Sequence, residues 1–492
     1  MKKQYWNIGV LLLLTSVLVY LLYWRFQVSQ TRFFDVDEFS YMHWTAQIAR
    51  GEHMYTDFFS YITPGFMWVF APIYWICGVS VQVFTAARTV SFIIFLGILG
   101  SLGYLFGITR GWKWALLPVV MLAFLPMPYD KFLEIRPDNL ATLLAIVGVI
   151  GEIWAIRKKN NNWPWLVSGL AYGASLFVLV KTLPFVAVGA GVAILSSRKK
   201  FPLFMLGIIV PWALFILGET VAGRLSIMWY SLTRLPFEAY KTAVNYYMGP
   251  NLLFYPNDWF YGRGSSPITF GLIVNHVIWI LALVVGAYRL VTPVRGKKDD
   301  TLIERLIAGI FFVSVASYIK FFPLKHSQYL ISIAVFVAYY AADGLANFFD
   351  WLTSAGGRES LSIVLLGFAY LLVVVTRDVN TPKLLWTNTA QLTEVATLIQ
   401  TVPLTDRVVD LEGRMVFWPD GYPVSGLPFD AFLSYVSRRP PPLAQYLAIH
   451  PAEYIYEGDS NRFITFSAEN LAYIKAHFAP VAGFGGRLLK SL

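Results

Sequence analysis

The segment FFDVDEFSYMH, which begins at Phe33, places three carboxylates within four positions of one another. Asp35 and Asp37 would share one face of an extended segment, whereas Asp37 and Glu38 would point apart. If a helix begins near Asp37 instead, its acidic first turn favours the positive end of the helix dipole. The pattern therefore predicts either a capped helix with a solvated acidic edge or carboxylates that serve as a general base.

Basic side chains that could complement these carboxylates stand beside later apolar runs. KFLEIRPDNLA supplies Arg136 and Asp138, SLFVLVKTLPF supplies Lys181, and KFFPLKHSQYL supplies Lys325 and His326. Lysines at the ends of membrane spans commonly extend towards the interface, so each one alone has a structural explanation. Together they predict a site for an anionic lipid phosphate, in which a carboxylate activates the nucleophile and cations neutralise the leaving phosphate.

The composition indicates the environment in which these residues act. Of 492 residues, 57% are hydrophobic and 14% are charged, compared with roughly 25% charged in ordinary globular domains. The chain is therefore predicted to cross a membrane several times. Its formal charge of +10 comes from short basic clusters between apolar runs, a topological pattern that argues against nucleic-acid binding. Cys77 is the only cysteine, which excludes an intrachain disulfide framework.

Eleven apolar runs are predicted to span the membrane, although several are shorter than the ~20 residues of an ideal span. The first is interpreted as a retained span, because no small-residue cleavage site follows it. The run at 64–79 is predicted to lie in the interface, since the later basic clusters then share the cytoplasmic side. The spans are about 8–24, 90–107, 112–127, 139–156, 163–180, 184–196, 201–218, 269–290, 302–319, 328–342 and 361–375.

This topology puts the N-terminus in the cytoplasm and the polar segments on the outer face. Residues 1–376 are predicted to form the transmembrane domain, with 25–89 as its first outer loop. Residues 377–492 alternate helical and strand patterns, which predicts a small extracytoplasmic α/β domain. The aromatic segment 219–268 is interpreted either as a cover for a lipid groove or as an interfacial aromatic belt.

The order of these motifs resembles the GT-C superfamily of membrane glycosyltransferases. The similarity is strongest to the branch of protein O-mannosyltransferases and lipid A aminoarabinose transferases, and it covers most of residues 30–345. It implies a mainly α, polytopic fold with about eleven transmembrane helices and juxtamembrane helices in the first outer loop. The small α/β domain follows this fold at the C-terminus.

Carried over by position, Asp37 matches the family's catalytic aspartate, with Glu38 beside it, and Arg88 matches a structural arginine. Asp138 matches the second acidic residue and Lys181 the lysine of the lipid-phosphate site. The late basic and aromatic motif corresponds to Lys325, His326 and Tyr329.

Two departures from the family pattern concern the phosphate site. Many relatives have Lys-Pro-Pro where this chain has Thr63, Pro64 and Gly65, so one expected cation is missing. Residues 181–184 read KTLP where Lys-Gly-Pro is frequent. Arg136 or Lys325 could supply the missing charge.

The resemblance implies inverting transfer of a hexosyl or pentosyl group from a polyprenyl-phosphate donor to an acceptor hydroxyl. The reaction is expected on the outer face of the plasma (inner) membrane, among membrane lipids, with a lipid, glycan or protein as acceptor. Asp37 is the expected base, and Asp35, Glu38 or Asp138 would orient it or the acceptor. No cofactor is established, although the clustered carboxylates could hold a divalent cation.

Two other function classes remain open from the sequence. A transporter or lipid flippase usually carries charges near the membrane midplane and internal repeats, and neither is evident here. A receptor with a ligand-binding C-terminal domain would leave the acidic segment without a role.

Overall fold

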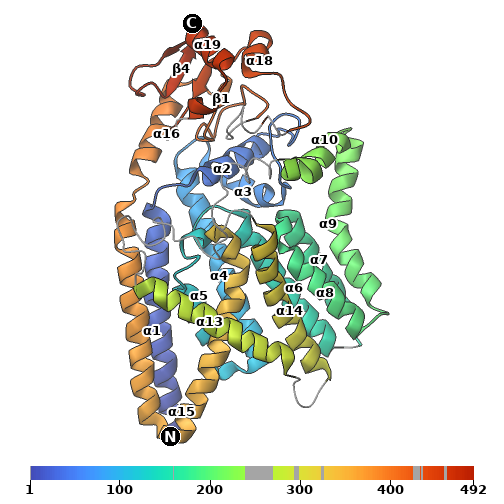
Figure 1. Ribbon diagram of the computed structural model, residues 1–492, viewed down its shortest axis with the longest axis vertical. Coiled ribbons are helices and arrows are strands. Elements are labelled where there is room, and N and C mark those ends of the chain that lie inside the picture. The colour runs from blue at the N-terminus through green and yellow to red at the C-terminus, as the bar shows by residue number, and fades with distance from the viewer. Residues whose placement is uncertain are drawn as a thin grey trace.

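The computed structural model describes residues 2–158, 160–238, 270–292, 298–322, 326–424, 433, 436–458 and 462–492. Long helices stand side by side in a bundle, and a small sheet with its own helices covers one end of it (Figure 1). We call this the capped end. The C-terminus lies there, whereas the N-terminus lies at the opposite end of the bundle (Figure 1).

Eight helices in the described part of the chain are long and apolar enough to cross a membrane. Six of these spans lie in separate helices, and non-helical backbone at Gly357 divides a merged helix into the last two. The helices are α1 (Lys2–Thr31), α4 (Gln82–Arg110), α6 (Pro137–Arg157), α9 (Phe201–Val221), α13 (Phe270–Val291), α14 (Lys298–Phe321) and the divided α15 (Ile331–Asn380). The chain is thus a multi-pass membrane protein.

Shorter helices occupy the three remaining predicted spans. They are α5 (Leu116–Phe124), α7 (Trp163–Val178) and α8 (Leu183–Ser196). α7 packs between α6 and α9. A Cβ atom added at Gly173 would lie 2.5 Å from the carbonyl oxygen of Ile208, so glycine is required where α7 meets α9. Such close backbone approach at small residues is typical of helix packing in membranes.

Two helices of the first loop lie together near the capped end, α2 (Val36–Ala49) and α3 (Gly65–Cys77) (Figure 1). α3 has 13 residues, a length of about 20 Å that is shorter than a hydrocarbon core of about 30 Å. It buries Phe66 and Phe70 and exposes Trp75 and Ile76. A short helix thus lies where the sequence predicted one at 64–79, and its place in the membrane interface stays a prediction.

The C-terminal unit contains the predicted alternation of helices and strands. Its sheet has the order β1-β2-β4-β3, with β1 parallel to β2 and the other pairs antiparallel. In register, Val408 lies opposite Tyr454, and Tyr454 lies opposite Lys490. The elements are α16 (Thr389–Thr401), β1 (Val408–Asp410), α18 (Leu443–Ile449), β2 (Tyr454–Tyr456), α19 (Ala468–His477), β3 (Phe478–Pro480) and β4 (Leu488–Ser491).

Short helical turns connect these elements, and some of them carry the site. They are η1 (Trp112–Trp114), η2 (Asp130–Phe132), η3 (Val180–Thr182), α10 (Leu225–Trp229), the π-helical η4 (Tyr230–Arg234), η5 (Ser327–Leu330), η6 (Pro382–Leu385) and η7 (Arg462–Thr465). The aromatic segment predicted at 219–268 is described only up to residue 238, and its remainder lies outside the described residues.

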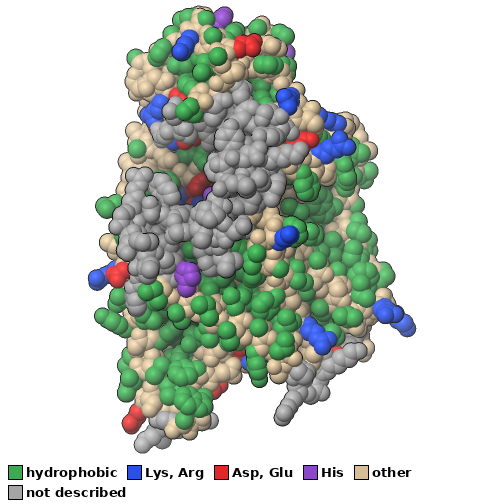
Figure 2. Space-filling model, in the orientation of Figure 1, with side chains coloured by type: hydrophobic (Ala, Val, Ile, Leu, Met, Phe, Trp, Pro, Cys, Tyr) green, Lys and Arg blue, Asp and Glu red, His purple; other side chains and the backbone are tan. Residues whose placement is uncertain are grey.

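The surface of the bundle is apolar along its side. Figure 2 shows hydrophobic side chains over this side, with Lys and Arg mainly near the two ends. Leu214 of α9 and Ile363 of α15 are among the exposed large hydrophobic residues. Apolar exposure of this extent is expected for a surface that faces lipid.

Candidate active site at the capped end

The acidic segment folds as a helix N-terminus. Asp35 is the N-cap of α2, and its Oδ1 accepts a hydrogen bond of 3.1 Å from the backbone N–H of Asp37. The Oε2 of Glu38 accepts one of 2.9 Å from the N–H of Asp35, which completes a capping box. The acidic segment is therefore a capped helix start and not an extended segment.

The edge of this helix is not uniformly solvated, because Glu38 is completely buried. Arg88 of α4 binds both of its carboxylate oxygens, at 3.0 and 2.7 Å, and the N–H of Ile135 donates to Oε1 at 2.9 Å. Arg88 also donates to main-chain carbonyls at the end of α1 and just after it. Glu38 therefore joins α2 to the membrane helices.

A buried segment before α6 supplies the partners of the other carboxylates. Lys131 Nζ lies 3.0 Å from Asp35 and 2.7 Å from Glu134. Arg136 Nη2 lies 2.9 Å from Asp37, and its Nε also binds Glu134. Lys131, Glu134 and Arg136 are all buried, so these charges are stabilised by one another and not by water.

The ion pairs extend into a network with equal numbers of cations and anions. Lys383 Nζ lies 2.6 Å from Asp130, and Arg32 lies 2.8 Å from Glu134. The cations are Arg32, Arg88, Lys131, Arg136 and Lys383, and the anions are Asp35, Asp37, Glu38, Asp130 and Glu134. We call this set the ion network. The formal charges of its members cancel, as expected for charges held away from water.

The neighbouring cations change the acidity of two network carboxylates. Burial raises the pKa of Asp35, but the charges of Lys131 and Arg136 outweigh burial and hold the pKa well below its usual range. Burial likewise raises the pKa of Glu134, and the same two cations lower it to about 2. Both groups therefore bind protons more weakly in the folded state than in the unfolded state.

This difference predicts loss of stability in acid. A carboxylate with a depressed folded pKa stabilises the protein above its unfolded pKa, about 4, and the stabilisation is lost as the pH falls towards about 2. In thermal unfolding of the detergent-solubilised protein, we expect a nearly constant midpoint from pH 7 to about 5 and a progressive decrease below. Asp35→Asn retains an N-cap but loses the charge, so its midpoint should be lower at pH 7 and depend less on pH. An unchanged pH dependence in this variant would contradict the assignment.

Asp37 differs from its two acidic neighbours in exposure. Its side chain is 44% exposed, against 25% for Asp35 and complete burial for Glu38. The carboxylate of Asp37 forms an ion pair with Arg136. Asp37 is therefore the carboxylate of this segment that an incoming molecule reaches most readily.

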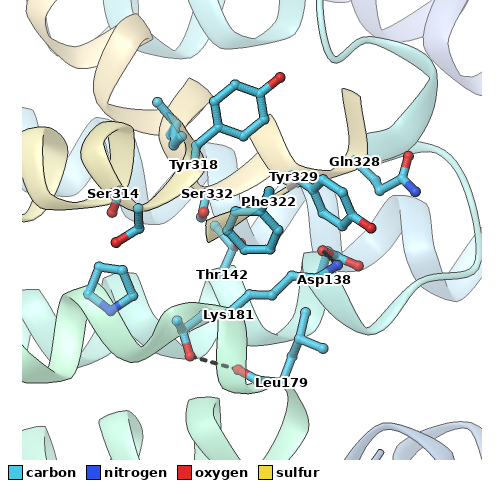
Figure 3. Close-up of a pocket in the computed structure, with 14 residues that line it drawn as sticks. Asp138, Thr142, Leu179, Lys181, Ser314, Tyr318, Phe322, Gln328, Tyr329 and Ser332 are labelled. Atoms are coloured by element: carbon cyan, nitrogen blue, oxygen red, sulfur yellow. Dashed lines mark hydrogen bonds and ion pairs between the residues drawn. The ribbon is translucent and has the colours of Figure 1, made fainter. Parts of the chain in front are cut away.

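A second ion pair lies in a pocket between the ends of the membrane helices. Asp138 stands in the first turn of α6, and Lys181 Nζ of η3 lies 3.0 Å from its Oδ1. Lys181 also lies over the ring of Tyr329, 4.3 Å from the centroid. Figure 3 shows the side chains of Lys181 and Tyr329 directed towards Asp138. The buried Oδ2 of Asp138 has no hydrogen-bond partner among the described residues.

The lining of this pocket combines polar and aromatic groups from four parts of the bundle. α6 supplies Asp138 and Thr142, and the segment around η3 supplies Lys181 (Figure 3). The other lining residues are Leu179, Thr182, Pro184, Ser314, Ser317, Tyr318, Phe322, Gln328, Tyr329, Ser332 and Ile333. The pocket is therefore built by α6, the η3–α8 segment, α14 and η5 with the start of α15.

Two tyrosines of the first loop connect the pocket to the acidic segment. Burial raises the pKa of Tyr41 well above its usual value, and Tyr61 and the carboxylates of Asp37 and Asp138 raise it further. The charges of both aspartates therefore act on Tyr41, which indicates that the two ion pairs lie near one another. The sequence analysis did not single out these tyrosines, because tyrosine is common throughout the chain, although Tyr41 lies within the acidic motif.

The late basic and aromatic motif is described in part, at His326 and Tyr329. His326 lies beside Tyr329, with ring centroids 6.2 Å apart. Burial and then the charge of Lys131 lower the pKa of His326 below its usual value. Lys325 lies outside the described residues. Within the described ranges, no group of three or more His, Cys, Asp or Glu side chains is arranged to hold a metal.

Residues 63–65, which lack the lysine expected from the family pattern, pack against α7. Thr63 Oγ1 donates to the carbonyl oxygen of Phe177, and a Cβ atom at Gly65 would lie 2.9 Å from that same oxygen. This approach to the C-terminal end of α7 explains why small residues occupy the segment. Its side chains contribute no cation, and among the described residues that line the pocket the cation is Lys181.

Sequence reasoning missed Arg32, Asp130 and Lys383 of the ion network. Lys383 and Asp130 are 253 positions apart, so no local spacing connects them. Arg32 directly precedes the acidic segment, and its place at the end of the first apolar run was the available signal.

Solved structures with the same overall architecture exist. The chain is similar to the oligosaccharyltransferase of Archaeoglobus fulgidus tethered with an acceptor peptide (TM-score 0.55, 11% identity), covering 97% of this chain and 72% of that one. It is also similar to ArnT from Cupriavidus metallidurans bound to undecaprenyl phosphate (TM-score 0.54, 13% identity, 98% of each chain covered). No family model and no curated protein matches the sequence. The fold is therefore of the GT-C type, as the motif order predicted.

Proposed function

We propose that this GT-C-type protein transfers a sugar from a polyprenyl-phosphate donor to an acceptor hydroxyl at the outer face of the plasma membrane. One observation carries the proposal. The half-exposed carboxylate of Asp37 is paired with Arg136, the N-cap of α6 two residues before Asp138, and Asp138 is in turn paired with Lys181 in the pocket. This arrangement supports a base beside cations that could bind a lipid phosphate.

In the proposed reaction, Asp37 accepts the proton of the acceptor hydroxyl. The acceptor oxygen forms a bond to the anomeric carbon as the bond from that carbon to the phosphate oxygen breaks, and the polyprenyl phosphate leaves with the bonding electrons. By analogy with inverting glycoside chemistry, the base stands on the acceptor side. The phosphate is a good leaving group, so neutralising cations replace a general acid.

The phosphate would compete with carboxylates for its cations. In the described structure, Arg136 is paired with Asp37 and Lys181 with Asp138. A donor phosphate that draws Arg136 towards itself would free Asp37 to act as a base. Lys325, the imidazole of His326 and the hydroxyl of Tyr329 are proposed to complete the phosphate site.

The other acidic residues receive supporting roles. The free Oδ2 of Asp138 is suited to accept a hydrogen bond from a donor-sugar hydroxyl. Asp35 caps α2 and Glu38 anchors it, so both would position Asp37 without touching the reacting atoms. The donor supplies the chemistry, and the proposal requires no metal or other cofactor.

The orientation of the site follows from the basic clusters. Arg157 and Lys158 end α6, and Arg198 and Lys199 follow α8, all at helix ends opposite to those that carry Asp138 and Lys181. Basic residues mark the cytoplasmic side, so the capped end would face outwards.

The test is an assay for release of free polyprenyl phosphate. The purified protein is incubated with a panel of polyprenyl-phosphate sugars and a membrane extract as the source of acceptor. We expect release with one donor, which would identify the sugar, and product analysis would identify the acceptor class. Folded protein that releases nothing from any hexosyl or pentosyl donor would contradict the proposal.

Removing the charge of Lys181 is expected to weaken donor binding. Lys181→Met keeps the side-chain length over Tyr329 but leaves Asp138 unpaired beside the incoming phosphate. We expect the KM for the donor to rise about ten- to a hundredfold, the effect of a charge-assisted hydrogen bond, measured by release of polyprenyl phosphate. Lys199→Met, an exposed lysine at the opposite end of the bundle, is the matched control. Equal donor KM values for the two variants would contradict this role.

A further inference from the structure

We infer that the C-terminal unit positions α2, the helix that carries the proposed base Asp37. It does so through a direct contact between residues 416–420 of the C-terminal unit and α2. The inference rests on the proposed function of Asp37 and extends it to a part of the chain whose role the sequence left open. The segment follows β1 and lies inside the unit that caps the bundle (Figure 1).

Three consecutive backbone carbonyls of this segment are each paired with a polar side chain from α2 or its C-cap. The three side chains, at positions 43, 47 and 50, follow the spacing of one helix face. The pairs are His43 Nδ1 with Val416 O at 3.3 Å, Arg50 Nη2 with Phe417 O, and Gln47 Nε2 with Trp418 O at 2.7 Å.

The contact is shielded from water. His43 and Gln47 are each 2% exposed, and Phe417 and Trp418 are each 1% exposed. The ring of Phe417 also packs edge-on against Tyr74 of α3, with centroids 6.0 Å apart. Hydrogen bonds in such surroundings are costly to break, because the freed carbonyl oxygens find no water.

His43 adds an ion pair to this contact. Its Nε2 lies 3.1 Å from Oδ1 of Asp420, while its Nδ1 faces a carbonyl oxygen. Both neighbours are acceptors, so only the doubly protonated imidazolium can donate to both. The charged groups that face His43 are Asp420 and Asp410 of the C-terminal unit, and its nearest polar neighbour on α2 is the neutral Gln47. Burial lowers the pKa of His43, but the charge and hydrogen bond of Asp420, the charge of Asp410 and the hydrogen bond to Val416 together raise it above its usual value.

These contacts hold the second half of α2, whereas the ion network holds the first. α2 has only 14 residues, with Asp37 in its first turn and His43 less than two turns later. Glu38 fixes the helix start to Arg88, so the 416–420 segment, together with Tyr74 and Trp75 of α3, sets the tilt and rotation about that point. Displacement of a reacting group by about 1 Å can lower a rate by about a hundredfold.

The experiment compares Asp420→Asn and His43→Gln with the wild-type protein, with kinetics and hydrogen exchange as readouts. We expect kcat to fall about ten- to a hundredfold with little change in the donor KM, because Lys181 and Arg136 lie on other elements. Amide exchange should become faster in α2 and remain unchanged in α6. The double variant should lose no more activity than the stronger single variant, since both remove one interaction.

The chain offers a matched control pair in the same first loop. His53 Nδ1 lies 3.1 Å from Asp57, but both side chains are substantially exposed. His53→Gln and Asp57→Asn should leave kcat and exchange in α2 unchanged.

Two results would contradict the inference. Unchanged kcat and unchanged α2 exchange in Asp420→Asn would overturn it, as would a rise in acceptor KM alone, which would indicate acceptor binding. If the wild-type protein transfers no sugar from any donor, the proposed function fails separately. Hydrogen exchange then decides the positioning role, and faster exchange confined to α2 sustains it.

Discussion

Replacing Asp37 with asparagine is expected to lower kcat for sugar transfer by about a thousandfold or more, within the usual range for loss of a general base. Asparagine has the same shape and still accepts a hydrogen bond from Arg136, so the helix and the ion network should persist. It cannot take the proton of the acceptor hydroxyl. The measurement is release of polyprenyl phosphate at saturating donor.

Two further measurements separate chemistry from folding in this variant. Donor binding, measured directly, should remain near that of the wild-type protein, because Lys181 and Arg136 are retained. Asp57→Asn makes the same substitution at an exposed aspartate of the first loop and should retain full activity. Wild-type turnover by Asp37→Asn would exclude Asp37 as the base.

Replacing Glu38 with glutamine is expected to destabilise the protein by about 3–5 kcal/mol, the usual consequence of removing one partner of a buried ion pair. Arg88 would remain charged and 1% exposed, with only main-chain carbonyls and a neutral amide as partners. The N–H of Ile135 would retain an acceptor, so the loss comes mainly from the uncompensated charge. Thermal unfolding in detergent measures the effect.

Glu52→Gln provides the control for this prediction. Glu52 belongs to the same loop but is exposed, so its substitution should change stability by no more than about 0.5 kcal/mol. A Glu38→Gln protein as stable as this control would mean that Arg88 does not depend on Glu38. Another contact would then have to hold α2 against the membrane helices.

Sequence patterns alone left the conformation of the acidic segment undecided. The order Asp-Val-Asp-Glu is compatible with a capped helix and with an exposed carboxylate cluster, and local patterns do not separate the two. The decision comes from Arg88, which lies 50 positions from Glu38 and buries it. Glu38 therefore anchors α2, and Asp37 is left as the more exposed neighbour.

The C-terminal unit shows a similar limit. Its alternation of helix and strand is readable from hydrophobic periodicity, because each element needs only its own residues to be recognised. The contact between His43 and Asp420 spans 377 positions. Nothing in the 416–420 segment indicates that its carbonyls bind α2, since backbone groups carry no sequence signal.

By itself, the sequence determined the membrane class, the short apolar helix at Gly65–Cys77, the GT-C motif order and the alternation of the C-terminal unit. These properties follow from apolar length and local periodicity, which each segment carries in its own residues. The tertiary structure alone decided which charges neutralise one another, that the pKa of His326 is lowered and that Asp37 remains accessible. Burial and ion pairing depend on residues that only folding brings within a few ångströms, and the energy of a charge depends on those neighbours.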